Sequence, residues 1–256
     1  MEKPPIWSES CLVRFNAIDK SDAMTLSSAL NFFQEAAVSH AESLGVGREA
    51  MARSGQVWIL SRMSVQIDRR PKYREAVTVR SWPRGWEKLF AIRDFDLYDA
   101  QGSPAIRARS CWIIIDMEKR RPMRPQAAMD GMPQNEGMDA LPFIPAGLAE
   151  RPSLLKTAEQ RAQYTDVDYN GHVNNVSYIR WIENAADPSL LEQAKQSRLD
   201  INYTNEILLG EAADLWSAEI DPPAGETPAP SRAFAFEGKK APDGKTAFRA
   251  ELRLWL

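Results

Sequence analysis

Two segments of this 256-residue chain match each other at an offset of 149 residues, and this internal repeat restricts the fold more than any other feature. Phe15–Asp19 aligns with Tyr164–Asp168. Without a gap, the same offset places Phe32 over Trp181. In both copies a helical pattern and then several strand patterns follow. The repeat therefore predicts two similar domains in tandem.

The hydrophobic pattern of each copy predicts one long helix and an antiparallel set of strands. In the first copy, apolar residues recur at steps of three and four from Leu26 to Leu44, and Gly45 ends this helix. Strands are predicted near Cys11–Ile18 and at Val57–Ile67, Ala76–Trp82, Leu89–Tyr98 and Ala105–Met117. In the second copy, the predicted helix is Val176–Ala186 and the predicted strands are Gln163–Asp168, Leu199–Asn205, Ala213–Ile220, Arg232–Glu237 and Thr246–Leu256.

Between the copies the periodic pattern disappears. From Arg121 to about Pro152, prolines are scattered among Gly and Met. A loop of this length is unusual within one compact domain, so it favours a linker between two domains. We expect an N-terminal domain at 1–120, a linker at 121–155 and a C-terminal domain at 156–256.

The composition excludes several classes of protein. The chain is 44% hydrophobic and 26% charged, with a formal net charge of −3, which argues against nucleic-acid binding. The polar start Met1–Pro5 does not resemble a signal peptide, and no run of roughly 18 uncharged apolar residues predicts a membrane span. Cys11 and Cys111 each lie in an apolar strand-like run, as buried thiols do. These features predict a cytoplasmic protein.

The segment Asp166–Asn175 gathers two carboxylates, a histidine and three asparagines, and four interpretations compete for it. The simplest is a polar turn, in which Asn174 or Asn175 caps the following helix and Gly171 adopts a positive φ. This interpretation does not require His172 or the two carboxylates beside it.

Two further interpretations are metal sites. Asp166, Asp168 and Asn170 match the first, third and fifth positions of a calcium loop, but Ser177 stands where a bidentate Glu is needed. A zinc site needs more ligands than His172 and the nearby carboxylates. We therefore expect neither a metal nor a cofactor.

The fourth interpretation is hydrolysis of an acyl compound. Asp168, Asn170 and His172 alternate, so in an extended stretch they would project to one side. The helix that starts next would point free backbone N–H groups at the same place, where an oxyanion develops. No Gly-x-Ser-x-Gly motif is present, which favours direct attack by water. In the first copy, Ser21 and Ala23 face Asn170 and His172, so one active site per chain is expected.

The segment Asp168–Glu183, with the order Asp-Tyr-Asn-Gly-His-Val-Asn-Asn, closely resembles the signature of acyl-acyl-carrier-protein (acyl-ACP) thioesterases of plants and bacteria. This resemblance implies an α+β fold of two tandem hotdog domains, each a long helix wrapped by a curved antiparallel sheet. It also implies catalytic roles for Asp168, Asn170 and His172, and for Glu206 in an aromatic-x-x-Glu context. We expect Glu206 or Asp168 to activate the water, and His172 and Asn170 to orient it or to bind the thioester oxygen; the sequence does not decide between the two carboxylates. Many members have Cys next to this Glu, whereas Ile207 stands here, which again favours water over a thiol nucleophile.

The implied reaction is hydrolysis of the thioester of fatty acyl-ACP, which releases the fatty acid and ends chain elongation. Phe32, Phe33 and Trp58 are candidates to line the acyl slot, and the basic clusters 69–72 and 119–121 are candidates to attract the acidic carrier protein. An acyl-CoA thioesterase and a non-catalytic acyl-binding protein are the alternatives. A homodimer is left open by the sequence.

Overall fold

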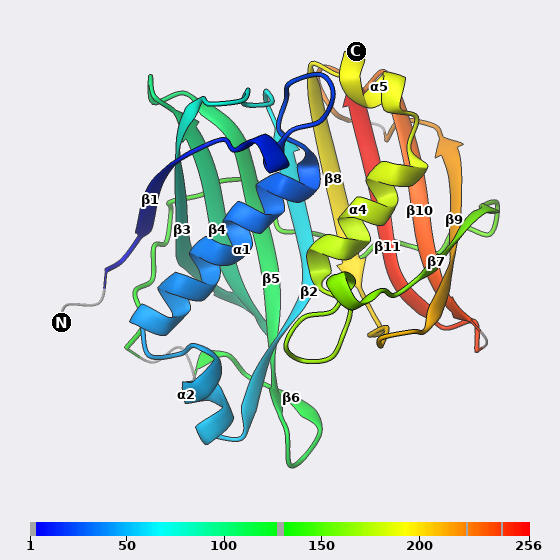
Figure 1. The fold of residues 1–256 in the computed structure, drawn as a ribbon. Coiled ribbons are helices and arrows are strands. Elements are labelled where there is room, and N and C mark those ends of the chain that lie inside the picture. Colours follow the sequence, from blue (N-terminus) through cyan, green and yellow to red (C-terminus); the bar gives the residue numbers. More distant parts are fainter. Residues whose placement is uncertain (1–3, 127–130, 224, 242) are drawn as a thin grey trace. The chain divides into compact units, whose positions relative to one another are not determined.

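The computed structural model describes residues 4–126, 131–223, 225–241 and 243–256. The chain divides into two compact units, drawn as ribbons in Figure 1. Unit 1 comprises Met1–Val65 and Arg70–Pro145, and unit 2 comprises Gln66–Arg69 and Ala146–Leu256. The boundaries predicted at 120 and 156 stay a prediction. In the described part of the chain, no helix is long and apolar enough to cross a bilayer.

Unit 1 is one long helix packed against an antiparallel sheet (Figure 1). The helices are α1 (Leu26–Ser43) and the shorter α2 (Arg48–Arg53), and a 3₁₀ turn spans Phe15–Ala17. The strand order is β1-β3-β4-β5-β2, and β6 pairs with β5. The strands are β1 (Trp7–Leu12), β2 (Gln56–Ile67), β3 (Ala76–Glu87), β4 (Phe90–Asp99), β5 (Pro104–Asp116) and β6 (Arg121–Met123). The Phe33 ring of α1 lies 5.1 Å from the Phe95 ring of β4, which joins helix and sheet in the core.

Unit 2 repeats this plan with a shorter helix. Its helices are α4 (Asn175–Ala185) and α5 (Pro188–Gln193), and a 3₁₀ turn spans Tyr164–Asp166. The strand order is β8-β11-β10-β9-β7, with β7 (Leu155–Arg161), β8 (Gln196–Tyr203), β9 (Ala212–Ile220), β10 (Arg232–Ala241) and β11 (Thr246–Trp255). The Tyr178 ring of α4 packs 5.2 Å from the Phe248 ring of β11. Each unit thus has the helix-on-sheet arrangement that the repeat predicts.

Local sequence explains where α1 begins and ends. The Thr25 hydroxyl accepts a hydrogen bond from the Ser28 N–H and caps the first turn. The buried face follows the three- and four-residue spacing, with Leu26, Ala29, Leu30, Phe33, Ala36, Ala37 and His40. Gly45 follows at φ +77°, a conformation that stops a helix at little cost for glycine. The predicted helix at 26–44 is confirmed.

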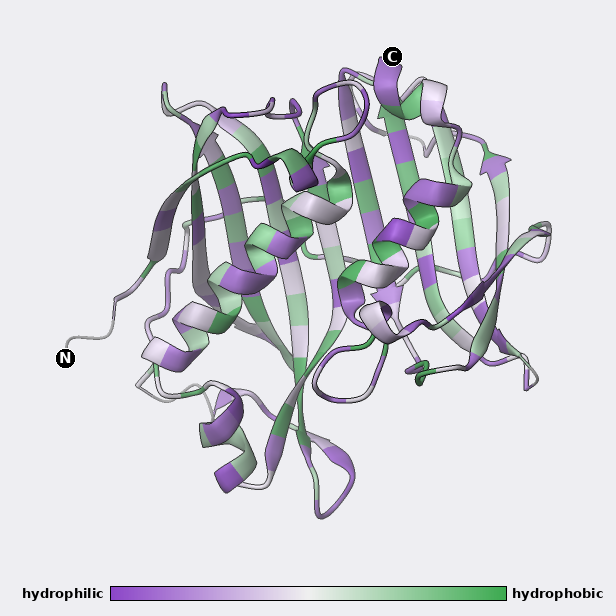
Figure 2. Ribbon diagram, in the orientation of Figure 1, coloured by the Kyte–Doolittle hydropathy of each residue, from purple (hydrophilic) through white to green (hydrophobic). Residues whose placement is uncertain are grey.

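The predicted strands that lie within the two sheets agree with the structure to within a few residues at most ends. Alternating hydrophilic and hydrophobic bands run along the strands in Figure 2, as expected for sheets with one face toward a helix. One clear difference is β3, which continues from Trp82 to Glu87 through a bulge between Pro83 and Gly85. The bulge accommodates Pro83, which a regular central strand would exclude.

The strand predicted at Gln163–Asp168 is wrong. The regular strand, β7, ends at Arg161, and a 3₁₀ turn follows at Tyr164–Asp166. The Asp166 carboxylate accepts a hydrogen bond from the Gln163 N–H at 3.0 Å and bends the chain out of the sheet. The strand predicted near Cys11–Ile18 is wrong in the same way, because β1 ends at Leu12 and a 3₁₀ turn follows at Phe15–Ala17.

The proline-rich segment from Gly131 to Ser153 has no helix or strand, but it is attached to the sheets. In unit 1, the Trp82 Nε1–H donates to the Met138 carbonyl at 2.9 Å. The Asp94 carboxylate accepts the Ala140 N–H at 2.9 Å, and Leu141 is buried. The segment is therefore ordered by polar contacts that no periodic pattern reveals.

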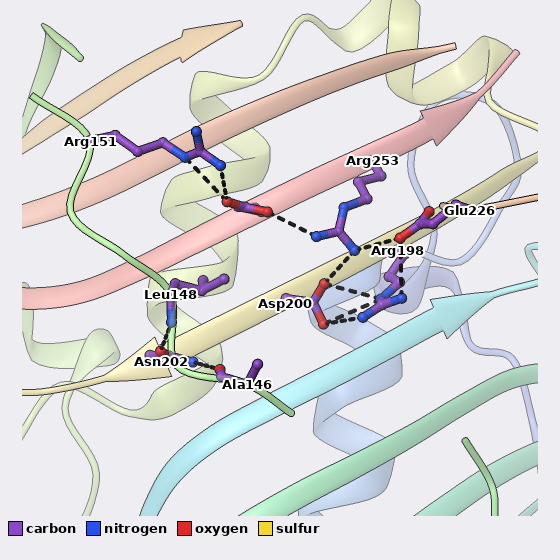
Figure 3. Close-up of polar contacts among 9 residues, drawn as sticks. Ala146, Leu148, Arg151, Arg198, Asp200, Asn202, Glu226 and Arg253 are labelled. Atoms are coloured by element: carbon purple, nitrogen blue, oxygen red, sulfur yellow. Dashed lines mark hydrogen bonds and ion pairs between the residues drawn. The ribbon is translucent and has the colours of Figure 1, made fainter. Parts of the chain in front are cut away.

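In unit 2, the end of this segment is anchored by side chains of β8 and β11 (Figure 3). Asn202 accepts the Leu148 N–H at 2.6 Å and donates to the Ala146 carbonyl at 3.0 Å. Arg151 donates to Glu251 at 2.6 Å. The remaining side chains of the network are Arg198, Asp200, Glu226 and Arg253.

His40 is fully buried in unit 1 and must be neutral to keep its contacts. Its Nε2 lies 2.8 Å from the Pro4 carbonyl, and its Nδ1 lies 3.2 Å from Nη1 of the buried Arg93. Since a guanidinium only donates, Nδ1 accepts and Nε2 carries the hydrogen. Burial, with the positive charge of Arg93, lowers the pKa of His40 below its ordinary value.

We therefore expect the free energy of unfolding to fall as the pH is lowered below about 6.5, the pKa of an unfolded histidine. In that window the unfolded chain binds a proton that folded His40 does not, and above it the stability is constant. Urea unfolding at pH 7.5 and 5.5 measures the effect. His40→Gln should flatten the dependence. The same dependence in the wild type and in His40→Gln would contradict the assignment.

Candidate active site

The predicted site segment is a tight turn and not an extended stretch, so the expected alternation of side chains is wrong. The Asp168 N–H donates to the His172 carbonyl at 2.9 Å, and the Gly171 N–H donates to the Asp168 carbonyl at 3.0 Å. Gly171 has φ +81°, which allows the chain to reverse there. Val167 and Val173 then pair as an antiparallel bridge.

The Asp168 carboxylate stabilises its own turn. Its Oδ1 accepts the Asn170 N–H at 2.8 Å. Asp168 is partly buried, whereas Asn170 is exposed. The turn therefore exposes the Asn170 amide to solvent, whereas the Asp168 carboxylate is partly buried and holds the turn.

The start of α4 is capped within the motif. The Asn174 side chain accepts the Val176 N–H at 2.8 Å, and its carbonyl accepts the Ser177 N–H at 2.8 Å. The capping role predicted for Asn174 is confirmed. The expectation that these N–H groups would be free for an oxyanion is wrong, because Asn174 already occupies them.

A second turn, residues 206–211, brings Glu206 to His172. The Val173 N–H donates to the Ile207 carbonyl at 2.8 Å, and His172 pairs with Leu208 as an antiparallel bridge. As a result, His172 Nδ1 lies 2.8 Å from Glu206 Oε2. The His172 side chain is 38% exposed and that of Glu206 is 62% exposed, so solvent reaches both.

Tyr178 is a neighbour of this pair that the sequence did not single out. It is buried in the first turns of α4, and its hydroxyl hydrogen-bonds to the backbone of Ile207. Burial raises its pKa, and the nearby charges of Glu206 and Asp168 raise it further. The phenol is therefore neutral, and it supports the backbone next to Glu206. Its position within the motif was the only signal in the sequence.

Unit 1 contains the same two turns without the same side chains. The Asp19 N–H donates to the Ala23 carbonyl at 3.0 Å, as Asp168 donates to His172 in unit 2. Asp22 has φ +60° at the place of Gly171. The backbone contacts of the two turns are thus related by the same offset of 149 residues as the two sequence segments. Ser21 and Ala23 therefore stand at the places of Asn170 and His172.

The unit 1 counterpart of Glu206 is Arg70, at an offset of 136 residues in the second turn. Arg70 forms an ion pair with Asp19, and Asp19 also accepts hydrogen bonds from Ser21. Burial alone would raise the pKa of Asp19, but the hydrogen bonds from Ser21 and Arg70 hold it below its ordinary value. In unit 1 the residue at the place of Glu206 therefore forms a structural ion pair with the counterpart of Asp168, because Ala23 stands at the place of His172.

The three candidates for the acyl slot lie in unit 1. Phe33 is in the core against Phe95. Phe32 is partly buried. Trp58 donates from Nε1 to the Val46 carbonyl at 3.0 Å and packs on a cluster that contains Leu44, Ala91, Met132, Trp86 and Trp112. Among the described residues, no three His, Cys, Asp or Glu side chains are arranged as a metal-ligand set.

Two family models match the chain. The model described as acyl-ACP thioesterase N-terminal domain matches residues 5–128, and the model described as acyl-ACP thioesterase C-terminal domain matches residues 150–241. Among curated proteins, the chloroplastic palmitoyl-acyl carrier protein thioesterase of Gossypium hirsutum is 26% identical over 221 residues. That match covers 78% of this chain and 52% of the relative, so the chain spans about half the length of the relative.

Two solved structures share the fold. An acyl-ACP thioesterase from Bacteroides thetaiotaomicron has a TM-score of 0.84 at 23% identity and covers 97% of both chains. The 12:0-ACP thioesterase from Umbellularia californica has a TM-score of 0.80 at 19% identity and covers 98% of this chain and 94% of that one. These likenesses confirm the α+β fold of two tandem hotdog units.

Proposed function

The chain belongs to the acyl-ACP thioesterase family, and from that premise we propose that it hydrolyses the thioester of a fatty acyl group on acyl carrier protein. The observation that supports this most is the 2.8 Å contact between His172 Nδ1 and Glu206 Oε2 in unit 2. In unit 1, Arg70 stands at the place of Glu206 and is paired with Asp19, and Ala23 stands at the place of His172. The proposed chemistry therefore belongs to unit 2 alone.

In the proposed mechanism His172 is the general base. Glu206 accepts the Nδ1 hydrogen of the imidazole, which leaves Nε2 free to take a proton from water. The water oxygen attacks the thioester carbon, and the side-chain amide of Asn170 donates to the carbonyl oxygen as it becomes negative. The C–S bond then breaks, and the imidazolium returns the proton to the leaving thiolate. The products are a fatty acid and the carrier thiol.

Asp168 has a different role in this mechanism. Its carboxylate holds the turn through the Asn170 N–H, so it positions the amide and does not act as the base. The sequence left both carboxylates open as the base. Glu206 contacts His172, whereas Asp168 contacts the backbone of its own loop. This difference favours Glu206 as the carboxylate that assists the base, His172.

Several finer points stay predictions within this proposal. Trp58 and Phe32 remain candidates for the acyl slot, whereas Phe33 has an ordinary core position. A cytoplasmic location, fatty acid biosynthesis as the pathway and a homodimer are also predictions. The alternative substrate is acyl-CoA, which carries the same thioester.

The charges of the duplicated turns favour a carrier-protein substrate. In unit 2, residues 162–172 and 206–211 contain four acidic side chains and no Lys or Arg. In unit 1, the equivalent residues 13–23 and 70–75 contain five basic and three acidic side chains. Phe15 and Tyr73, which are 76% and 43% exposed, pack together there.

We propose that this surface of unit 1, formed by Arg14, Phe15, Lys72, Tyr73 and Arg74, binds the acidic carrier. It overlaps the predicted cluster 69–72, although Arg70 itself is engaged by Asp19. Long-range attraction between opposite charges raises the rate of encounter and weakens as salt is added.

Reversing two of these charges tests the carrier. Arg14→Glu with Arg74→Glu should raise KM for acyl-ACP by roughly tenfold at low salt and leave KM for acyl-CoA unchanged. Thiol release from both substrates measures this. Arg120→Glu, in the other predicted basic cluster, is the control and should leave both constants unchanged. Equal KM values of wild type and the double variant for acyl-ACP would contradict this docking surface.

A further inference from the structure

Glu206 is held in place by the backbone around it more than by packing of its own side chain. Its side chain is 62% exposed. On the N-terminal side, the Thr204 N–H and the Asn205 N–H both donate to the Ala247 carbonyl of β11. On the C-terminal side, the Val173 N–H and the Tyr178 hydroxyl contact Ile207, and the turn 206–211 supplies the rest of the restraint. The position of the Glu206 carboxylate therefore depends on how firmly that turn is closed.

Glu211 closes this turn. Its Oε2 accepts the Leu208 N–H at 2.9 Å, and its own N–H donates to the Leu208 carbonyl at 3.0 Å. Gly210 between them has φ +81°. Leu208 is also the residue that pairs with His172. Glu211 thus fixes the backbone that connects Glu206 to the loop of His172.

The Glu211 carboxylate is ionised when it makes these contacts. Lys240 Nζ of β10 lies 3.0 Å from the same Oε2. The hydrogen bond from Leu208, together with Lys240, holds the pKa of Glu211 below its ordinary value. A charged acceptor makes a shorter and stronger bond to a backbone N–H than a neutral one.

Unit 1 contains the same closure in a turn that carries no catalytic side chain. The Glu75 Oε2 accepts the Lys72 N–H at 2.9 Å, and the Glu75 N–H donates to the Lys72 carbonyl at 3.0 Å. Arg74, at the place of Gly210, has φ +62°. Both units therefore close this turn with a glutamate, and Glu75 is the matched counterpart of Glu211.

We propose that Glu211 is a positioning residue for thioester hydrolysis, which keeps Glu206 in contact with His172. This inference rests on the proposed function. Displacement of a catalytic group by about 1 Å can lower a rate by about 100-fold. The contribution of Glu211 is to kcat and not to substrate binding, because it holds a group that assists the base and contacts no part of the substrate.

Glu211→Ala should lower kcat for acyl-ACP by roughly 10- to 100-fold with little change in KM. Glu211→Gln keeps an oxygen acceptor for the Leu208 N–H and should recover most of kcat. Glu75→Ala removes the same closure from unit 1 and should lower thermal stability to a similar extent while kcat is retained. The imidazole ¹⁵N resonances report the contact directly, because the chain has two histidines and His40 is buried.

The His172 resonance should shift in Glu211→Ala and stay in place in Glu75→Ala. An active wild type with equal kcat for Glu211→Ala and Glu75→Ala, and an unmoved His172 resonance, would overturn the positioning role and leave the proposed function intact. A folded wild type that releases no thiol would overturn both.

Discussion

Replacing Glu206 by glutamine is expected to lower kcat for acyl-ACP by about 100- to 10,000-fold, the usual contribution of acid–base assistance. The amide oxygen of glutamine can still accept the Nδ1 hydrogen, but it carries no negative charge to stabilise the imidazolium. The exposed side chain leaves folding unaffected, so the melting temperature should not change. Thiol release from acyl-ACP, with single-turnover kinetics, measures the loss.

The pair should act as one unit. His172→Ala is expected to cost at least as much as Glu206→Gln, and the double variant no more than the worse single one, because residues of one catalytic unit are strongly non-additive. Arg70→Gln in unit 1 is the matched control, since Arg70 lies at the place of Glu206, and it should keep kcat. Independent, multiplying losses in the double variant would argue against the dyad.

Replacing Arg109 by methionine is expected to lower the free energy of unfolding by about 3–5 kcal/mol, the usual cost of breaking a buried ion pair. Arg109 on β5 donates to both oxygens of Asp94 on β4, at 2.7 and 2.6 Å. Their side chains are 3% and 0% exposed. Without the guanidinium, Asp94 is left charged and buried, and the Phe143 carbonyl loses its donor. Urea unfolding at pH 7.5 measures the loss.

A cross-strand pair at the surface provides the control for Arg109. Arg232 on β10 donates to both oxygens of Glu219 on β9, but these side chains are 37% and 48% exposed. Arg232→Met should therefore lower the free energy of unfolding far less than Arg109→Met does. Combining Arg109→Met with Asp94→Leu should recover part of the loss, because no unpaired charge remains. Losses of equal size at the two sites would contradict the role assigned to burial.

Most of the helices and strands follow from the sequence, because burial of one face imposes a period that can be counted. The β-branched and aromatic residues of β2 and β5 place their ends to within a residue or two. The repeat also predicts the tandem plan. The short β7 and α2 were missed, since neither buries enough apolar surface to leave a clear pattern.

The geometry of the site was less accessible to sequence reasoning. Counting alternation placed Asp168, Asn170 and His172 on one face, but hydrogen bonds within the turn override that count. Glu206 came from the family resemblance, because no local pattern links residues so far apart. Its unit 1 counterpart, Arg70, appears only when the second turns are superimposed through their backbone contacts, since the offset there is 136 residues and not 149.

The polar attachments of the segment 131–153 were also beyond the sequence. Its residues have no period, and Ala140 and Leu141 are buried through contacts with distant strands. Asp94 and Arg109 look like alternating surface charges on β4 and β5 until that segment covers them. Charged residues at such positions can be recognised as buried only when the covering chain is known.

The most direct test is the release of free fatty acid from acyl-ACP by the purified chain, followed for the wild type and for Glu206→Gln in parallel. A catalytic site in unit 2 predicts continuous release by the wild type, one fatty acid and one free thiol for each acyl-ACP consumed, and a rate lower by at least about 100-fold for the variant. No release by the folded wild type, or the same rate from both proteins, would contradict the central claim.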